Sequence, residues 1–493
     1  MSKGERIVGV VSFVVLAAQV GMPWTIPHYV TQDGPSHRYT AMVAKNLVLH
    51  PASDFSSVYQ LNPRVMPNWA STILFNAIES GEWTEKIMTS FVLLAGFFSM
   101  GYAIRSFAPD VPPWSPLINF VLQTWFLGMG FYNFYLAIVV CPLLIGFYVR
   151  RAEKLTVRHG LVVAAGLVAL FFTHLLGAGI AMIAIGAIAV ANLLRRREVR
   201  EIVMVAASFA PVLALMGIFA LGPAAGQFEL PIEEDWMQFP QQVFGTRLLW
   251  PVVGSMIAGA LVLRNGKDSP QDGLAVAILA VAAIYVAAPS EGLGGSFIQS
   301  RLAWAIFVLG VVLAGSARRL EKVRVVVSIY AAAVVAWGLM ESRAEAMGWN
   351  AAAGDYLKAT EKITRGARLA RVRYPVPEVR EPTAEQPYIV NRLLHFDAEA
   401  AVRCGCVDLG DYQAASGIFP VEFKGRVAAD SQMALWSLEG TDRHEAALMK
   451  VLGELPVAVD YVVVVGRGDV EAMLGERMRV VGESGMVKVY GPR

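Results

Sequence analysis

Two long apolar runs without an ionised side chain constrain this chain more than any other feature. Residues 115–149 and 159–194 contain no Asp, Glu, Lys or Arg. Each run is too long for a single helix across the hydrocarbon core of a bilayer, which about 20 residues span. We therefore expect each run to form a tight helical hairpin, with turns near residues 128–133 and 174–179.

The same reasoning extends to the rest of the chain and predicts about eleven transmembrane helices. The apolar runs cover 7–27, 87–104, 115–131, 133–149, 159–174, 177–194, 202–221, 248–263, 273–289, 302–316 and 325–340. The composition agrees, because only 17% of the 493 residues are charged, against roughly 25% in a soluble domain. We expect an α-helical polytopic membrane protein. No basic tract interleaved with aromatic residues appears, so we expect no nucleic-acid partner.

The distribution of basic residues predicts the orientation in the membrane. With an inside N-terminus, 17 basic residues fall on inside segments and six on the outside loops between spans. This bias follows the positive-inside rule and predicts a multi-pass inner (cytoplasmic) membrane protein whose C-terminal domain is extracytoplasmic. It requires that residues 67–81 do not cross, so we expect an interfacial helix there.

Three parts of the chain differ in character. Residues 1–341 form the predicted membrane domain, with a long first outer loop at 28–86 that contains helices at 34–48 and 67–81. Residues 342–387 are predicted to hold an amphipathic helix (344–371) and a proline-rich linker. Residues 388–493 are predicted to be a C-terminal soluble α/β domain outside the membrane. Its expected strands are 388–390, 402–409, 419–423, 460–465 and a closing pair at 478–490, and its expected helices are 444–453 and 469–477.

The cysteines and one group of acidic residues have structural interpretations. Cys404 and Cys406 fit either a disulfide in an oxidising compartment or two free thiols, and we expect free thiols. Cys141 lies in an apolar run and is expected to act as a small apolar side chain. Glu79, Glu82 and Glu85 lie three residues apart and are expected to share one solvated helical face.

Polar residues collect at the expected outer ends of the helices. Asp33, His37 and Arg38 follow the first span. Asn133 lies in the turn of the first hairpin, and His174 lies in the turn of the second. Arg301 caps the outer end of a later helix. The span interiors lack the ionisable groups that ion-coupled carriers usually need. These residues predict a site at the membrane–water boundary, open to a lipid-linked substrate and an acceptor.

Each of these residues also has a purely structural interpretation. Asp33 can cap a helix that begins at Pro35, and His37 and Arg38 can be ordinary interfacial residues. Asn133 can satisfy backbone groups in its turn, and His174 can be a hydrogen-bonded residue at a helix end. Arg301 can extend its charge to lipid headgroups. The spacing of His28, Asp33 and His37 also permits a divalent metal.

The arrangement resembles the GT-C glycosyltransferases, membrane enzymes that include protein O-mannosyltransferases, the aminoarabinose transferase of lipid A and oligosaccharyltransferases. The resemblance rests on a first span, an Asp soon after it, and a long outer loop with two interfacial helices. Its local motif is Asp33-Gly-Pro-Ser-His37. It implies that a sugar is transferred from a polyprenyl-phosphate carrier, with Asp33 as general base or metal partner. A soluble outer domain is also common in that family.

The function expected on this basis is inverting sugar transfer at the outer leaflet. Asp33 is the expected base, and Arg301, Arg38 and His174 are expected to stabilise the departing phosphate. The expected partners are a polyprenyl-phosphate-linked sugar donor and membrane lipids. The alternative is a non-enzymatic membrane protein: a transporter of a lipid or small solute, or a scaffold that anchors the outer domain.

Overall fold

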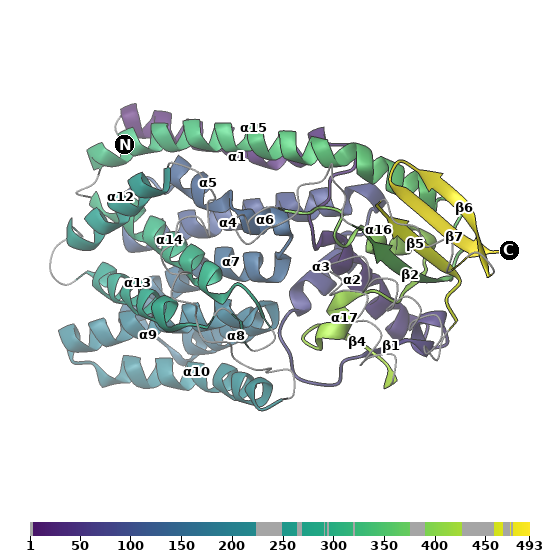
Figure 1. The fold of residues 1–493 in the computed structure, drawn as a ribbon. Helices are drawn as coiled ribbons and strands as arrows, with labels where there is room; N and C mark the ends of the chain where they lie inside the picture. Colours follow the sequence, from purple (N-terminus) through teal and green to yellow (C-terminus); the bar gives the residue numbers. More distant parts are fainter. Residues whose placement is uncertain are drawn as a thin grey trace. The chain divides into compact units, whose positions relative to one another are not determined.

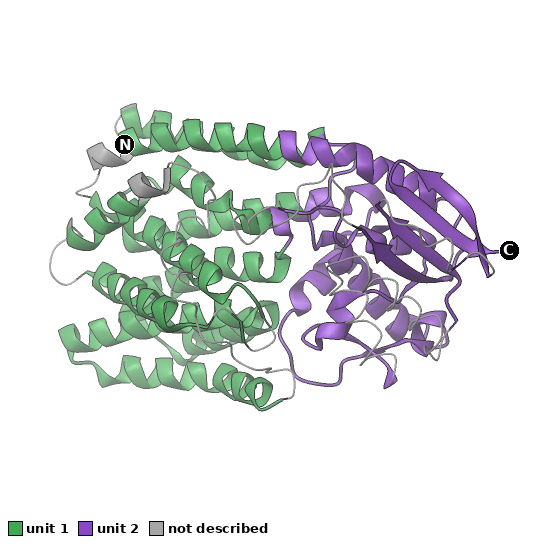
Figure 2. Ribbon diagram, viewed as in Figure 1, with its two compact units in different colours: residues 1–25, 89–127, 131–343 green, residues 26–88, 128–130, 344–493 purple. Residues whose placement is uncertain are grey.

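The computed structural model describes residues 3–222, 249–263, 269–289, 291–292, 295–318, 321–374, 390–425, 458–466, 474 and 477–493. They form two compact units, coloured separately in Figure 2. Unit 1 comprises residues 1–25, 89–127 and 131–343, and unit 2 comprises residues 26–88, 128–130 and 344–493. Unit 2 therefore joins segments that are more than 250 residues apart in the chain, and it contains all the named strands.

Unit 1 is a set of apolar helices (Figure 1). They are α1 (Lys3–Gly21), α4 (Thr84–Phe107), α5 (Pro116–Leu122), α6 (Trp125–Met129), α7 (Tyr132–Arg151), α8 (Val157–Thr173), α9 (Leu175–Arg196), α10 (Val199–Ala220), α12 (Leu249–Leu263), α13 (Pro270–Ala287), α14 (Ile298–Ser316) and α15 (Glu321–Thr360). Helices α4, α6 and α15 extend into unit 2. Local capping explains where some helices begin: Thr156 and His159 form a capping box on α8, and the Ser269 hydroxyl caps α13.

Eight helical segments in the described part of the chain are long and apolar enough to cross a membrane. They are Gly4–Thr25, Gly81–Phe107, Tyr132–Lys154, Leu175–Arg196, Val199–Ala220, Pro270–Ala287, Ile298–Ser316 and Val325–Thr360. In α14, 94% of the most apolar window is buried, against 22% in α10, so α14 is an interior helix and α10 a peripheral one. The polytopic helical architecture is confirmed, whereas the number eleven stays a prediction.

The other three predicted spans correspond to shorter helices. Helix α8 has 17 residues and α12 has 15. The run 115–131 is not one helix, because α5 ends at Leu122 and α6 begins at Trp125. The hydroxyl of Tyr135 donates to the carbonyl of Leu122, which a continuous helix would offer to an amide four residues later. The turns of the two hairpins lie where expected, at residues 130–131 and at His174.

Unit 2 contains two sheets and several helices (Figure 1). The larger sheet has the strand order β3 (Val407–Asp408), β2 (Arg368–Arg373), β5 (Tyr461–Val465), β7 (Val487–Pro492) and β6 (Met478–Ser484). Strands β3, β2 and β5 are parallel, and β7 and β6 continue the sheet antiparallel. All five residues of β5 are buried, as expected for a valine-rich inner strand. The helices are α2 (Gly34–Leu49), α3 (Trp69–Ile78), α16 (Phe396–Cys404) and α17 (Tyr412–Ser416).

The first outer loop and the C-terminal segment form one interlocked structure within unit 2. Strand β1 (Tyr59–Leu61) of the loop pairs antiparallel with β4 (Val421–Phe423), with Tyr59 opposite Phe423. One hydrophobic core contains Tyr39 and Tyr59 from the loop and Phe396 from α16. Because strand pairing and a shared core tie these segments together, neither is an independent domain.

Several local expectations need correction. The helix expected at 344–371 is the continuation of the last span, because α15 runs without a break to Thr360 and Arg368–Arg373 is strand β2. Trp349, Ala353 and Tyr356 in the C-terminal part of α15 are buried in the hydrophobic core of unit 2, and this packing stabilises the helix beyond the apolar run. Of the strand expected at 402–409, residues 402–404 are the end of helix α16, and only Val407–Asp408 form strand β3.

Other expectations for the C-terminal domain are confirmed or lie outside the described residues. Strands β5, β6 and β7 confirm the runs at 460–465 and 478–490, and β4 lies within 419–423. The helices predicted at 34–48 and 67–81 correspond to α2 and α3. Residues 388–389 and 444–453 and most of 469–477 lie outside the described part of the chain.

The expectation of free thiols at Cys404 and Cys406 is wrong, because the structure joins them in a disulfide. The bond links the end of α16 to the residue before β3. Gly405 between them adopts a left-handed conformation (φ +61°), which reverses the chain direction at the end of the helix. Cys141 is a buried free cysteine, as expected.

Candidate active site around Asp33

Asp33 lies at the end of the segment that leads into α2, and backbone contacts hold this segment in place. The amide of Asp33 donates to the carbonyl of Met129 (2.9 Å), which belongs to the same unit. The neighbouring Gly130 has φ +74°, and a Cβ there would lie 2.1 Å from the hydroxyl oxygen of Thr31. Only glycine permits this close approach, so the position of Asp33 depends on it.

The carboxylate of Asp33 does not cap α2, although Asp33 occupies the N-cap position. Its Oδ2 accepts a hydrogen bond of 2.7 Å from the hydroxyl of Tyr412. Its Oδ1 lies 3.7 Å from Nε2 of His395, whose ring stacks on Tyr412 with centroids 4.2 Å apart. The residue is only 6% exposed. Capping by the side chain is therefore the wrong interpretation, and the carboxylate contacts residues of the C-terminal segment instead.

His37 is a neutral, hydrogen-bonded residue in this structure. Burial lowers its pKa to about 3, although a hydrogen bond to the backbone of Gly130 acts in the opposite direction. Its Nδ1 lies 3.0 Å from Nε2 of Gln413 and 3.1 Å from the hydroxyl of Ser71. An amide nitrogen can only donate, so Nδ1 is the acceptor. His37 thus links α2 to α17 and carries no positive charge towards a phosphate.

The positive charge of Arg38 is compensated by two carboxylates. Its guanidinium donates to both oxygens of Glu399 (2.7 and 2.9 Å) and to both oxygens of Glu79 (2.6 and 3.1 Å). Burial opposes the charge, but the two carboxylates outweigh it and raise the pKa of Arg38. Such paired, charge-assisted contacts hold α2 against α16 and the end of α3.

The expectation that Glu79, Glu82 and Glu85 share one solvated helical face is wrong. Helix α3 ends at Ile78, just before Glu79, whereas Glu82 lies in a short 3₁₀ turn and Glu85 in α4, so no single named helix carries all three. Glu79 binds Arg38, and Glu82 binds Arg403 at 2.8 Å. Glu85 is buried and accepts a hydrogen bond of 2.6 Å from the amide of Thr31. A sequence spacing of three indicates a common face only within one continuous helix.

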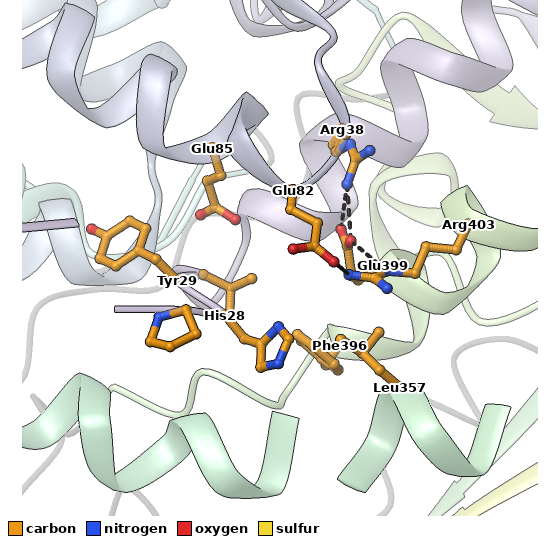
Figure 3. A pocket seen from close by; sticks show the side chains of 12 residues that line it. His28, Tyr29, Arg38, Glu82, Glu85, Leu357, Phe396, Glu399 and Arg403 are labelled. Carbon is orange, nitrogen blue, oxygen red and sulfur yellow. Dashed lines mark hydrogen bonds and ion pairs between the residues drawn. The ribbon is translucent and has the colours of Figure 1, made fainter. Parts of the chain in front are cut away.

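Glu85 explains why a glycine follows Asp33. A Cβ on Gly34 would lie 1.9 Å from Oε1 of Glu85, so the buried carboxylate occupies the space of a side chain at position 34. Glu85 also lines a pocket of about 320 Å³, including the solvent at its mouth (Figure 3). The pocket is lined by Pro27, His28, Tyr29, Val30, Arg38, Gly81, Glu82, Glu85, Leu357, Phe396, Glu399 and Arg403. It therefore presents hydrogen-bond donors and acceptors beside apolar side chains.

The arrangement of His28, Asp33 and His37 does not fit a divalent metal. Among the described residues, no group of three or more His, Cys, Asp or Glu side chains is placed to hold a metal ion. His37 is already engaged through Nδ1 by Gln413, and Asp33 by Tyr412. The ligand set suggested by sequence spacing is therefore not formed.

The other three predicted site residues lie in unit 1. Nη1 of Arg301 lies 2.9 Å from Nε2 of His174, and the guanidinium lies 4.9 Å from the ring centres of both Phe131 and Phe134. Nδ1 of His174 also lies 3.2 Å from the amide nitrogen of Leu176 at the start of α9. A neutral imidazole accepts at only one nitrogen, so His174 accepts either from this amide or from Arg301. Asn133 is buried in the first turn of α7. The structure thus joins His174 to Arg301, with two aromatic faces beside them.

Three residues next to Asp33 and His37 were missed by sequence reasoning: His395, Tyr412 and Gln413. They lie more than 350 positions along the chain from Asp33, in a segment without a recognisable catalytic motif. The one local signal is Asp411, whose side chain accepts from the amide of Gln413 and caps α17. That signal predicts a short helix, but it does not indicate what the helix contacts.

Comparison with known proteins gives a general likeness only. No protein-family model and no curated protein sequence matches this chain. Among solved structures, the chain is similar to the oligosaccharyltransferase of Archaeoglobus fulgidus, crystallised with a tethered acceptor peptide that contains the NVT sequon. The match covers 98% of this chain and 74% of the other, with 11% sequence identity and a TM-score of 0.39. A likeness of this size assigns neither a family nor a reaction to this chain.

Proposed function

We propose that this chain is a membrane glycosyltransferase that moves a sugar from a polyprenyl-phosphate carrier to an acceptor at the outer face of the inner membrane. The observation that carries the proposal is the carboxylate of Asp33. It is buried, it does not cap its helix, and its two oxygens contact Tyr412 and His395. Burying a carboxylate costs free energy, and a buried acid with specific polar partners is a candidate for proton transfer.

The proposed reaction uses Asp33 as the general base. The oxygen of an acceptor hydroxyl attacks the anomeric carbon, and the bond from that carbon to the phosphate oxygen breaks. The departing polyprenyl phosphate keeps the electron pair, and the acceptor proton passes to Asp33. Arg301 is the proposed phosphate contact, because its guanidinium is oriented by His174 and two aromatic rings.

The remaining predicted residues take supporting roles in this proposal. Asn133 and His174 are assigned to the surroundings of the phosphate, on the donor side. His37 and Arg38 are assigned to holding α2, because a neutral ring and a doubly compensated guanidinium cannot offset the charge of a phosphate.

The proposed topology has eleven spans, an inside N-terminus and an outside unit 2. The pairing of β1 with β4 requires residues 26–88 and 344–493 to lie on one side of the membrane. Seven of the eight candidate spans lie between these segments, an odd number that would separate them. If α5 and α6 together make a further crossing, the parity is restored. Helices α8 and α12 preserve the parity only if both cross or neither does, so it allows nine or eleven spans, and eleven is the number proposed here.

Two further observations favour an extracytoplasmic unit 2. The loops between spans on its side of the membrane are the ones poor in basic residues. The disulfide between Cys404 and Cys406 also suits an oxidising compartment. An alkaline phosphatase fusion at Arg493 should be active in a bacterial host. Activity of a cytoplasmic reporter at the same position would contradict the orientation.

The proposed reaction is tested in two stages. Mass spectrometry of lipids that copurify with the detergent-extracted protein should identify a polyprenyl-phosphate sugar, which then serves as donor in a transfer assay. Asp33→Asn should lower turnover by roughly a hundredfold or more while the protein stays folded. Asp54→Asn is the matched control, because Asp54 is an exposed carboxylate of the same loop. Wild-type turnover in Asp33→Asn would remove Asp33 from the mechanism.

A further inference from the structure

We propose that Tyr412 of α17 is a positioning residue that orients the carboxylate of Asp33 for proton transfer. The inference rests on the proposed function, because it takes Asp33 as the base. It adds that the first outer loop alone does not form the catalytic site, which the C-terminal segment completes.

Hydrogen bonding sets the direction in which the Tyr412 hydroxyl donates. The Thr40 hydroxyl donates to Oε1 of Gln413 (2.8 Å), which identifies the other side-chain atom as the amide nitrogen. That nitrogen lies 3.3 Å from the Tyr412 hydroxyl and 3.0 Å from Nδ1 of His37. An amide nitrogen has no acceptor capacity, so the Tyr412 oxygen accepts from it. The phenolic proton then points to Oδ2 of Asp33 at 2.7 Å.

The ring of Tyr412 is held in place on its face and through its helix. His395 stacks on it with an interplanar angle of 27°. Burial, together with the charges of Arg371 and Arg373, lowers the pKa of His395, so the stacked ring is neutral. At the helix start, the carboxylate of Asp411 accepts from the amide of Gln413 (3.1 Å). A ring restrained in these ways presents its hydroxyl to Asp33 in one orientation.

This contact affects the base in two ways. It fixes the rotation of the Asp33 carboxylate, because the phenol holds Oδ2 and the carboxylate is planar, so the position of Oδ1 is fixed as well. It also stabilises the ionised form, because hydrogen bonds donated to a carboxylate favour its charge. Loss of the phenolic hydroxyl should therefore reduce turnover and make ionisation of the base require a higher pH.

The first test measures the contact without any transfer assay. Asp33→Ala, Tyr412→Phe and the double variant are compared by thermal unfolding of the full-length protein in detergent. Each single variant loses the hydrogen bond between Asp33 and Tyr412, so the sum of the two single shifts counts that loss twice. The double variant loses the bond only once. The double variant should therefore melt at a higher temperature than the sum of the single shifts predicts. Additive shifts would overturn the inference, because they would mean that the two side chains do not interact.

The second test separates positioning from a structural role. With the donor identified above, Tyr412→Phe should lower kcat roughly tenfold or more, as expected for a lost hydrogen bond to a charged group, with KM little changed. The acidic limb of its pH–rate profile should move up by about one pH unit. Tyr356→Phe is the matched control, because Tyr356 is also fully buried in unit 2 and its hydroxyl has no hydrogen-bond partner among the described residues.

The outcomes distinguish the inference from the proposed function. Coupled unfolding with a Tyr412→Phe pH profile identical to that of the wild type would overturn the positioning role and leave Asp33 as the base. Coupled unfolding in a wild-type protein that transfers no sugar from its copurified lipid would overturn the proposed function and the role of Tyr412 with it. Coupled unfolding with a shifted pH profile supports both.

Discussion

Arg38 and Arg301 are both basic residues expected on the outer side, yet the two units surround them differently. In unit 2, Arg38 is 7% exposed and binds the carboxylates of Glu79 and Glu399. In unit 1, Arg301 lies beside the imidazole of His174 and two phenyl faces. Carboxylates offset the charge of a guanidinium, whereas aromatic faces beside it restrain its orientation. The comparison teaches that one residue type can hold two segments together in one region and, in another, be the proposed contact of an anionic ligand.

The largest expected effect on stability tests the structural side of this comparison. Arg38→Met removes one partner of a buried ion pair and leaves the two carboxylates without it. Such a loss typically lowers the free energy of unfolding by about 3 to 5 kcal/mol. Thermal unfolding in detergent measures it. An unchanged melting temperature would mean that Arg38 does not hold the first loop to α16.

Arg301 should respond in the opposite way, with a large effect on activity and a small one on stability. Arg301→Gln should lower turnover by roughly a hundredfold, the usual result of removing one donor to a developing negative charge. Arg343→Gln is the matched control, because Arg343 is an exposed arginine of the same unit. If Arg301→Gln retained full transfer while its melting temperature collapsed, the contrast between the two arginines would be reversed.

The pH dependence of stability sharpens the comparison, since unit 2 contains a buried acid next to Tyr412. Burial, reinforced by the nearby charge of Asp397, raises the pKa of Asp411 to about 7, against the effect of two backbone hydrogen bonds. The folded protein therefore keeps this proton between about pH 4 and pH 7, where the unfolded chain has lost it. Stability must fall as pH rises through this range.

Asp411→Asn removes this titration and keeps an acceptor for the α17 cap. Between pH 5 and pH 8 the wild type should lose roughly 2 to 3 kcal/mol more unfolding free energy than the variant, by linkage. The pKa of Asp408 is also raised, by its burial and by the nearby charges of Asp397 and Asp411, so the difference between the two curves reports the linked titration of Asp408 and Asp411. Parallel pH–stability curves would show that Asp411 is ionised throughout.

The smallest effect is expected at an exposed ion pair of the same unit. Arg64 binds Glu422 at 2.6 Å, but its side chain is 39% exposed. Arg64→Met should therefore change the unfolding free energy by about 1 kcal/mol or less. The variant serves as the reference for Arg38→Met. A loss as large as that of Arg38→Met would mean that burial does not explain the difference between the two ion pairs.

Local patterns in the sequence were sufficient for the elements that depend on nearby residues. The charge-free runs predicted the helices of unit 1 and the turn at His174, because the bilayer imposes length and polarity on each segment separately. The valine-rich run at 460–465 predicted β5 for a similar reason, since buried inner strands are apolar throughout. Where a competing contact intervened, as Tyr135 does at the end of α5, the pattern did not predict the break.

The sequence by itself determined that Asp33 follows the first apolar helix, and it predicted which polar residues lie at helix ends. Only the tertiary structure decided what these residues contact. The carboxylate of Asp33 could cap a helix or bind a partner, and both are local possibilities for an Asp before Gly-Pro. Tyr412, 379 residues away, determines the outcome, because the pairing of β1 with β4 and the shared core bring the two segments together. Such long-range pairing leaves no periodic signal in either segment, since it depends on complementary surfaces rather than on residue spacing.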